Sequence, residues 1–369
     1  MKINLYFFIS NFSYGGASNA ILNYLINLDY TKFNVCMIFL DNSELQNDLL
    51  KNIKLIKIDT KIKIFKTFFC FFKLKKILKK STTKHKKNIF ISNINYSNVL
   101  SILFLRKIQN LKIILFERTS LKELDVFKNF FTFFKSKIIK FLLKFTYSKA
   151  DRILANSKTV SLELEKYGLS SEVVYSGSIN KLIKSKEINK KNFFNIISVG
   201  RLSHQKDYFT LLKSVRLIKS KNFMIKIYGE GEYKKKLTSF IHENNLEKKV
   251  KLLGYEKNKD KIYKNADLLV HTAIFEGLPN VLVEALNYGV PIIAAKGYGG
   301  ISEVLNHGKY GQLFEPQNEI ELAKKINQFM QNPTLLQKKT KKSKSYIKNF
   351  TYQNSCKSLE KILISVLKH

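Results

Sequence analysis

The chain has 369 residues, which favours two domains, and its 45% hydrophobic and 25% charged residues are typical of a globular protein. With only 15 glycines and 4 prolines, a collagenous or Pro-rich disordered chain is excluded. Lys and Arg number 65 against 28 Asp and Glu, giving a net charge of +37. This excess predicts an anionic partner, unless it reflects only the coding bias of a genome poor in G and C.

The first apolar run, 3–9, lacks the small-residue cleavage site of a signal peptide, so we interpret it as a buried strand. The Phe-rich run 67–72 is far shorter than the roughly 20 residues of a spanning helix. The three cysteines are scattered, and no two have the spacing of metal ligands. This cysteine usage suits a reducing cytoplasm better than a secreted disulfide scaffold.

The first half alternates short apolar runs with longer amphipathic segments. The apolar runs predict strands at 3–9, 34–40, 53–58, 88–92, 111–116, 152–155 and 172–175. Helices are expected between them, such as 17–28 and 134–148. This alternation predicts an α/β domain with a parallel sheet and helices on both faces.

The second half repeats this pattern after a polar, Lys-rich segment. Strands are expected at 194–199, 223–228, 250–253, 267–271, 290–294 and 311–314, and helices at 207–219, 232–244, 258–264, 280–288, 300–306 and 319–331. We therefore expect a first domain at 1–178, a linker at 179–192, a second domain at 193–345 and a C-terminal helical segment at 346–369. Open parallel sheets bind ligands at the carboxyl ends of their strands, so polar residues and glycines there are candidates.

Two stretches of the first domain are basic and aromatic. Residues 60–116 carry 14 Lys or Arg and no Asp or Glu, and residues 126–150 carry six Lys and no acid. Phenylalanines and lysines interleave over 127–149, and a helix there would have an apolar face with a basic border. Such a helix suits a membrane interface, and the alternative is a core helix with solvated lysines.

Three strand ends carry candidate ligand-binding residues. After the first strand, Gly15 and Gly16 precede a helix and could bring backbone N–H groups to a phosphate, or form only a tight turn. After the first strand of the second domain, Arg201 and Lys206 could converge on a diphosphate, or remain solvated charges. The run 228–232 lacks the third glycine of a dinucleotide fingerprint and comes too late in its domain, so we reject NAD binding.

The block 275–286, FEGLPNVLVEAL, carries the strongest signal. Glu276 follows a strand, Pro279 suits the first turn of a helix, and Glu284 falls in the second turn. The helix N-terminus favours a phosphate, and the two carboxylates can accept hydrogen bonds from sugar hydroxyls. The block therefore predicts a sugar-nucleotide site, the alternative being that Glu284 only caps the helix or pairs with a lysine.

Together these motifs resemble the retaining glycosyltransferases of family 4, most densely over 195–316. The resemblance rests on 200–206 and 275–286, and also on ALNYGVPIIA at 285–294 and GISEV at 300–304. It implies the GT-B fold, in which two Rossmann-like domains with parallel sheets face each other across a cleft. It also implies that the C-terminal helix crosses back to the first domain.

The resemblance implies a role for each matching residue. Arg201 and Lys206 would bind the donor diphosphate and stabilise its charge as it leaves, so that no metal or other cofactor is required. Glu284 would bind the nucleotide ribose, and Glu276 would lie beside the transferred sugar. The backbone groups of Gly277, Leu278 and Asn280 would face the sugar or the phosphate. Gly15 and Gly16 would approach the diphosphate from the first domain.

The chain departs from the family at two places. Many members carry a His at the strand end where this chain has Glu117. In this replacement the chain resembles relatives that assemble lipid-linked oligosaccharides with N-acetylhexosamines or galactose. We predict that Glu117 replaces this His, the alternative being a simple pair with Arg118 or a lysine. Ser18 and Asn19 stand where many relatives have Glu-Arg, which leaves acceptor contacts there open.

The predicted function is retaining transfer of a hexose or N-acetylhexosamine from a nucleotide sugar, UDP-linked, to a lipid-linked saccharide. The acceptor would be a polyprenyl-diphosphate-linked glycan of a surface polysaccharide such as O antigen or capsule. The enzyme would lie in the cytoplasm, peripherally bound to the anionic inner face of the cell membrane. The alternatives are a non-catalytic GT-B scaffold, a sugar-nucleotide hydrolase or epimerase, and a nucleic-acid-binding protein, for which the sequence has no motif.

Overall fold

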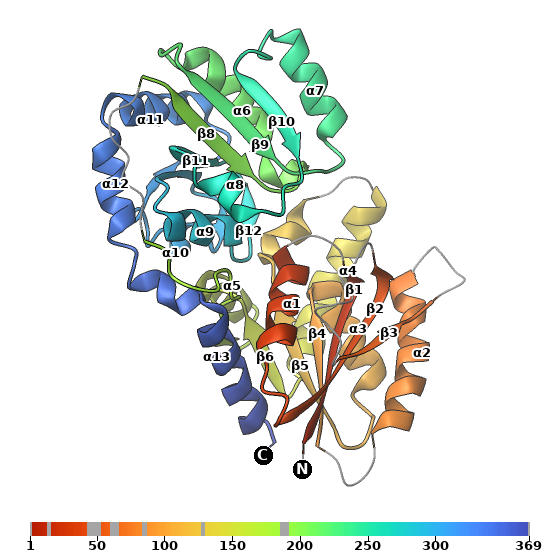
Figure 1. The fold of residues 1–369 in the computed structure, drawn as a ribbon. Helices are drawn as coiled ribbons and strands as arrows, with labels where there is room; N and C mark the ends of the chain where they lie inside the picture. The colour runs from red at the N-terminus through yellow and green to blue at the C-terminus, as the bar shows by residue number, and fades with distance from the viewer. Residues whose placement is uncertain are drawn as a thin grey trace. The chain divides into compact units, whose positions relative to one another are not determined.

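The computed structural model describes residues 2–12, 16–42, 53–59, 66–82, 87–126, 130–184 and 192–367. The chain forms two compact units (Figure 1). Unit 1 comprises Met1–Gly177 and Tyr352–His369, and unit 2 comprises Ser178–Thr351. Each unit contains a parallel sheet with helices, as the alternation of the sequence predicts.

The sheet of unit 1 has seven strands in the order β3-β2-β1-β4-β5-β6-β7, and its neighbouring strands are parallel. The strands are β1 (Ile3–Phe12), β2 (Phe33–Asn42), β3 (Lys54–Lys57), β4 (Asn88–Asn93), β5 (Leu111–Glu117), β6 (Arg152–Ala155) and β7 (Glu172–Val173). All seven predicted strands are confirmed, although β1 is longer than expected and β7 is shorter. Apolar runs buried on both faces of a parallel sheet give this strong signal.

Helices cover both faces of this sheet. They are α1 (Gly16–Asn27), α2 (Lys66–Ser81), α3 (Asn95–Leu105), α4 (Phe130–Tyr147), α5 (Lys158–Glu165), α13 (Tyr352–Ser365) and the 3-10 helix η2 (Leu121–Asp125). Because side chains alternate along a strand, Tyr6 and Phe8 of β1 pack with α2, α3, α4 and α5, whereas Leu5 and Phe7 pack with α1 and α13. Unit 1 therefore has one apolar core on each side of its sheet.

The C-terminal helix α13 belongs to unit 1, which confirms the predicted return of the chain to the first domain. Leu359 and Leu363 are fully buried in its core, and Ser355 Oγ donates a 3.0 Å hydrogen bond to the hydroxyl of Tyr24 in α1. The 3-10 helix η5 (Tyr346–Phe350) belongs to unit 2 instead. The segment 346–369 is thus shared between the units, and its division falls between Thr351 and Tyr352.

The main sheet of unit 2 has six strands in the order β10-β9-β8-β11-β13-β15. The strands are β8 (Phe194–Val199), β9 (Phe223–Tyr228), β10 (Val250–Gly254), β11 (Leu268–His271), β13 (Ile292–Ala295) and β15 (Gln312–Phe314). These six strands were predicted. A separate parallel pair, β12 (Phe275–Glu276) with β14 (Tyr298–Gly299), was not, because two-residue strands have no periodicity.

The helices of unit 2 follow the predicted positions, with two differences. They are α6 (Tyr208–Ser214), α7 (Lys234–Glu243), α8 (Lys259–Tyr263), α9 (Asn280–Tyr288), α10 (Ile301–Val304), α11 (Glu319–Gln331), α12 (Pro333–Lys341) and the 3-10 helices η3 (His204–Lys206) and η4 (Val215–Leu217). The expected helix 207–219 continues as 3-10 helix after α6. Helix α12 was not expected, and it begins with a proline, which has no N–H to lose there.

Part of the expected linker 179–192 packs within unit 2. The N–H of Ile183 donates to Asn287 Oδ1 (3.1 Å), and Asn287 Nδ2 donates to the carbonyl of Lys181 (3.0 Å). Residues 185–191 lie outside the described residues. The first residues of this segment are therefore held by helix α9, which also carries Glu284.

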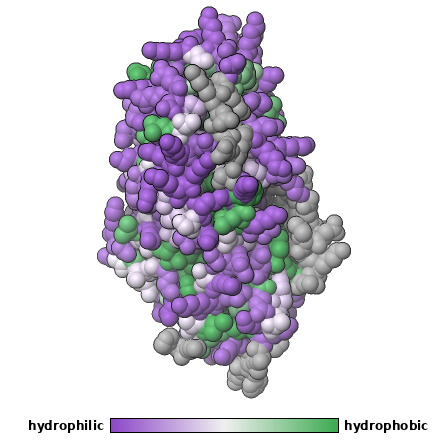
Figure 2. Space-filling model, turned by 60° about the vertical axis from the view of Figure 1, so that its left-hand side comes forward, coloured by the Kyte–Doolittle hydropathy of each residue, from purple (hydrophilic) through white to green (hydrophobic). Residues whose placement is uncertain are grey.

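Hydrophilic residues cover most of the face drawn in Figure 2, and hydrophobic residues form small patches among them. Among the described residues, no helix combines the length and the apolar character needed to cross a bilayer.

Two glycines bring the ends of β8 and β9 close together. Gly200 and Gly229 both have φ of 152°, a conformation that L side chains rarely adopt. A Cβ atom on Gly229 would lie 1.9 Å from the carbonyl oxygen of Gly200. The backbones can therefore pair, with the N–H of Gly200 donating to Tyr228 (3.0 Å) and that of Leu202 to Glu230 (2.9 Å). The run 228–232 leads from the end of β9 into a turn.

Substitution of Gly229 by Ala should lower the free energy of unfolding by about 3 kcal/mol, because the new Cβ both strains the backbone and overlaps the loop after β8. Gly308→Ala is the matched control in unit 2, since Gly308 also has positive φ but its added Cβ meets nothing closer than 4.0 Å. It should cost about 1 kcal/mol. Urea denaturation of both variants measures the difference, and equal losses would contradict the proposed overlap.

Candidate active site

Lys206 and Glu276 form a nearly buried ion pair in unit 2. Lys206 ends the 3-10 helix η3, and Glu276 lies on the short strand β12. The ammonium group contacts Glu276 Oε1, and the two side chains are only 14% and 12% exposed. Thr272 Oγ1 fixes the backbone by donating to the carbonyl of Lys206 (2.7 Å). The structure thus brings together two residues that the sequence separates by 70 positions.

The surroundings of Glu276 keep its carboxylate charged. Burial by itself would raise its pKa, but Lys206 and His271 together lower the pKa to about 2. His271, at the end of β11, is buried, and its Nε2 atom lies 3.5 Å from Glu276 Oε1. The side-chain amide of Gln205 donates to the carbonyl of Phe275 (2.8 Å). A fixed anion therefore lies beside a fixed cation at the carboxyl ends of these strands.

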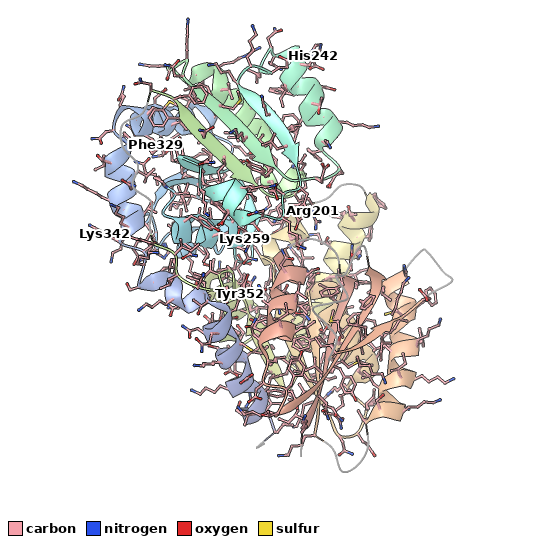
Figure 3. The ribbon with its side chains drawn as sticks, in the orientation of Figure 1. Arg201, His242, Lys259, Phe329, Lys342 and Tyr352 are labelled. Carbon is pink, nitrogen blue, oxygen red and sulfur yellow. The ribbon has the colours of Figure 1, made fainter. Side chains whose placement is uncertain are left out.

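Arg201 follows β8 and is exposed (Figure 3). Its guanidinium group forms no hydrogen bond or ion pair with any residue that the structure describes. An exposed Arg at a strand end can bind two oxygens of an anion at once. Of the two predicted diphosphate ligands, Arg201 is thus available, whereas Lys206 is already paired with Glu276.

Glu284 accepts hydrogen bonds from two residues of helix α8. The hydroxyl of Tyr263 donates to its Oε2 atom (2.8 Å), and Lys259 Nζ lies 2.6 Å from its Oε1 atom. The side chain of Glu284 is 13% exposed. The sequence interpretation in which Glu284 pairs with a lysine is therefore correct for this structure, and it leaves a ligand role open because Lys259 itself is 42% exposed.

The N-terminus of helix α9 follows the predicted Gly277–Asn280 segment. Pro279 occupies the N-cap position, so the first helical residue is Asn280, and no described side chain caps the helix. The carbonyl of Gly277 accepts the N–H of Gly300 (2.8 Å), and Leu278 is buried. Asn280 Oδ1 accepts the hydroxyl of Ser178 (2.8 Å). The helix dipole at this end favours an anion.

In unit 1, Glu117 ends strand β5 and is fully buried. The hydroxyl of Tyr147 donates to Glu117 Oε2 (2.8 Å), and Asn98 Nδ2 donates to the same hydroxyl (3.0 Å). Burial raises the pKa of Glu117 to about 7, although the bond from Tyr147 opposes this rise. The carboxyl group of Glu117 therefore titrates near neutral pH.

Arg118 does not neutralise Glu117 through its side chain. Its Nε atom donates to Asn93 Oδ1 (2.6 Å), and its guanidinium carbon lies 3.8 Å from the centre of the Phe116 ring. Burial lowers the pKa of Arg118 to about 10. The contact of Arg118 with Glu117 is through the backbone N–H, at 3.2 Å. The alternative of a simple Glu117–Arg118 pair is therefore wrong.

The remaining predicted residues are the paired glycines of unit 1. Gly16 is exposed and opens helix α1, whereas Gly15 lies outside the described residues. Sequence reasoning missed four residues that contact the candidates, namely Lys259, Tyr263, His271 and Tyr147. Only Lys259 and Tyr263 carried a signal, since their spacing of four places them on one face of a helix.

The chain is similar to known proteins in sequence and in fold. Residues 178–350 match the family model described as "Glycosyl transferases group 1". A Campylobacter jejuni protein, N-acetylgalactosamine-N,N'-diacetylbacillosaminyl-diphospho-undecaprenol 4-alpha-N-acetylgalactosaminyltransferase, is 29% identical over 269 residues, or 71% of either chain. A second enzyme of that organism, GalNAc-alpha-(1->4)-GalNAc-alpha-(1->3)-diNAcBac-PP-undecaprenol alpha-1,4-N-acetyl-D-galactosaminyltransferase, is 27% identical over 95% of this chain and 94% of its own.

A solved structure extends the comparison to both units. Anabaena HepE, crystallised with UDP-glucose, has a TM-score of 0.81 and 19% identity over 98% of this chain and 100% of its own. This likeness shows the fold, and the family match covers the unit that holds Lys206, Glu276 and Glu284. Residues 178–350 are thus similar to the glycosyl transferases group 1, and the chain has the GT-B fold.

Proposed function

We propose that the protein is a family 4 enzyme that transfers a hexose or N-acetylhexosamine from a UDP-sugar, with retention of configuration, to a polyprenyl-diphosphate-linked saccharide. The product would be an intermediate of a surface polysaccharide such as O antigen or capsule. The Lys206–Glu276 pair beside the free Arg201 carries this proposal. The names of both Campylobacter relatives specify undecaprenol-linked diphosphate acceptors, which supports the acceptor class.

The proposed chemistry follows from the charges of unit 2. When the bond between the anomeric carbon and the diphosphate breaks, its electron pair stays on a phosphate oxygen. Arg201 and Lys206 would bind that oxygen and its neighbours, so the reaction would need no metal to neutralise the charge. Glu276, held anionic, would stabilise the positive charge that develops on the sugar, and Glu284 would accept the ribose hydroxyls.

Glu117 would face the reacting sugar from unit 1. It is buried against Tyr147 and has a pKa of about 7, so a small change of surroundings on ligand binding decides its charge. We propose that the ionised form stabilises the sugar cation. Gly15 and Gly16 would supply backbone N–H groups to the diphosphate.

The lipid-linked acceptor would lie in the inner face of the cell membrane. Unit 1 would bind this membrane through the surface formed by α2, α3 and α4. Helix α4 exposes an apolar stripe along its length, and α2 and α3 add three further exposed side chains, Phe69, Phe72 and Leu103. The stripe consists of Phe130 (77% exposed), Phe134 (50%), Ile138 (56%), Phe141 (68%) and Phe145 (53%). Exposed lysines border it, and anionic lipid is the partner that this combination fits.

Replacement of Lys206 by Ala should lower kcat by about 100-fold or more, because one preorganised charge is lost from the departing diphosphate. Lys213→Ala, which removes an exposed lysine of α6, is the control and should leave turnover unchanged. Transfer from UDP-glucose, UDP-galactose and their N-acetyl forms to a polyprenyl-diphosphate saccharide measures the effect.

Lys206→Ala also leaves the buried Glu276 carboxylate without its partner, which destabilises the fold by itself. The double variant Lys206→Ala/Glu276→Gln removes this penalty. It should recover the thermal stability of the wild type but not its turnover. Turnover like that of the wild type in either variant would exclude the proposed role of Lys206.

Glu117→Gln should remove a pH-dependent loss of stability. Folding raises the pKa of Glu117 from its ordinary value to about 7, so the protonated form favours the folded state. The stabilisation is full below about pH 4.3 and is lost as the pH rises through 7, a difference of about 3 kcal/mol between wild type and variant. Urea denaturation from pH 4 to 8 tests this, with exposed Glu165→Gln as control.

Activity separates the structural from the catalytic role of Glu117. The Gln variant keeps an oxygen that can accept the Tyr147 hydroxyl, so it should fold at least as well as the wild type. We expect turnover to be lost at every pH. A stable variant with normal turnover would remove Glu117 from the mechanism.

Reversing two lysines beside the exposed stripe should weaken binding to anionic vesicles. Each surface lysine near the bilayer contributes about 1 kcal/mol, and the new carboxylates are repelled by anionic lipid, so Lys137→Glu/Lys144→Glu should lower partitioning by at least roughly 30-fold. The control Lys213→Glu/Lys235→Glu changes the net charge equally on unit 2. Flotation with phosphatidylglycerol vesicles at low and high salt is the measurement, and equal loss in both variants would mean an unspecific charge effect.

A further inference from the structure

Helix α8 directs two side chains toward one carboxylate. Lys259 and Tyr263 are four residues apart and therefore lie on the same face of the helix. Their terminal atoms reach different oxygens of Glu284, since Tyr263 donates to Oε2 at 2.8 Å and Lys259 lies 2.6 Å from Oε1. The two contacts together fix the position of the carboxylate on helix α9.

The two partners of Glu284 differ in their access to solvent. Tyr263 is fully buried, whereas the side chain of Lys259, labelled in Figure 3, is 42% exposed. Burial raises the pKa of Tyr263 well above its ordinary value, so the phenol keeps its proton and remains a donor. A solvated ammonium group can be displaced by a ligand, but a buried phenol stays in place. The Oε1 side of Glu284 is therefore the side that a ligand can reach.

The phenol itself is held rigidly. Its ring stacks on the ring of Tyr288, with 5.2 Å between the ring centres and 29° between the planes. The hydroxyl of Tyr288 donates to Asp260 Oδ1 (2.5 Å), which lies on α8 beside Lys259. Helices α8 and α9 are thus joined through an aromatic pair, and Tyr263 has little freedom to leave Glu284.

We propose that Tyr263 is a positioning residue for nucleotide binding. It locks Glu284 so that the Oε1 side, which contacts Lys259 in this structure, meets the ribose hydroxyls. This inference rests on the proposed role of Glu284 as the ribose ligand. A mobile Glu side chain loses conformational entropy when it binds a ligand. A hydrogen bond that already orders the side chain reduces this cost. The hydrogen bond from Tyr263 supplies this order without touching the ligand.

The effect of Tyr263 should appear in binding and not in the chemical step, because the ribose is remote from the bond that breaks. Tyr263→Phe should raise the Kd for UDP about 10-fold and raise KM for the UDP-sugar similarly, with kcat at saturation unchanged. Tyr346→Phe is the matched control, because it removes a phenol hydroxyl of unit 2 that donates to the carbonyl of Glu303. It should change Kd by less than twofold.

A double-mutant cycle shows whether Tyr263 acts through Glu284. Isothermal titration with UDP compares the wild type, Tyr263→Phe, Glu284→Ala and the double variant. We expect Glu284→Ala to weaken binding strongly and Tyr263→Phe to add less than twofold in that background. Inorganic pyrophosphate, which has no ribose, should bind all four proteins equally.

The outcomes separate the inference from the proposed function. Normal UDP binding by Glu284→Ala would overturn the ribose role of Glu284 and this inference with it. Weak binding by Glu284→Ala but normal binding by Tyr263→Phe would overturn only the inference, as would equal effects of Tyr263→Phe in both backgrounds. Should Tyr263→Phe fail to fold by thermal denaturation, Glu284→Gln tests the same hydrogen bond, because its neutral oxygen accepts more weakly. A raised KM with unchanged kcat would support the inference, and an unchanged KM would overturn it.

Discussion

The ion pair of Lys206 with Glu276 is the interaction on which the candidate site of unit 2 depends. Both side chains are nearly buried, so neither can lose its partner without leaving a charge in a poorly solvated place. The pair joins the loop after β8 to the short strand β12, and Gln205 reinforces the connection through the carbonyl of Phe275.

The carboxylates of the two units experience opposite surroundings. Glu276 lies next to a cation and has a pKa of about 2, whereas Glu117 lies next to a neutral phenol and has a pKa of about 7. Groups of one chemical type whose pKa values are driven apart can take different roles in one reaction. A permanently charged Glu276 suits stabilisation of a cationic sugar, while Glu117 can change its charge when its surroundings change.

The sequence predicted the elements well and the partners of the site poorly. Buried parallel strands are continuous apolar runs, so all the strands of both main sheets were visible, whereas β12 and β14 were too short to show periodicity. Glu276 and Glu284 belong to one local sequence motif, which places the first on strand β12 and the second on helix α9. The partner Tyr147 of Glu117 is 30 residues away in the chain, and no local pattern predicts a contact that only the packed fold creates. His271 is only five residues from Glu276, but a single histidine at the end of an apolar run gives no sign of this contact.

The buried and the exposed lysines of the chain act over different distances. Lys206 is almost excluded from water and affects only groups in direct contact, so salt has little influence on it. The exposed lysines of α4 act through water, where the field decays within about 8 Å at physiological ionic strength. The short-range charge therefore suits recognition of a bound diphosphate, and the long-range charge suits attraction to a surface that carries many anions. A lipid-linked diphosphate acceptor at an anionic membrane would require both, which is why the excess charge and the buried pair fit a single proposed function.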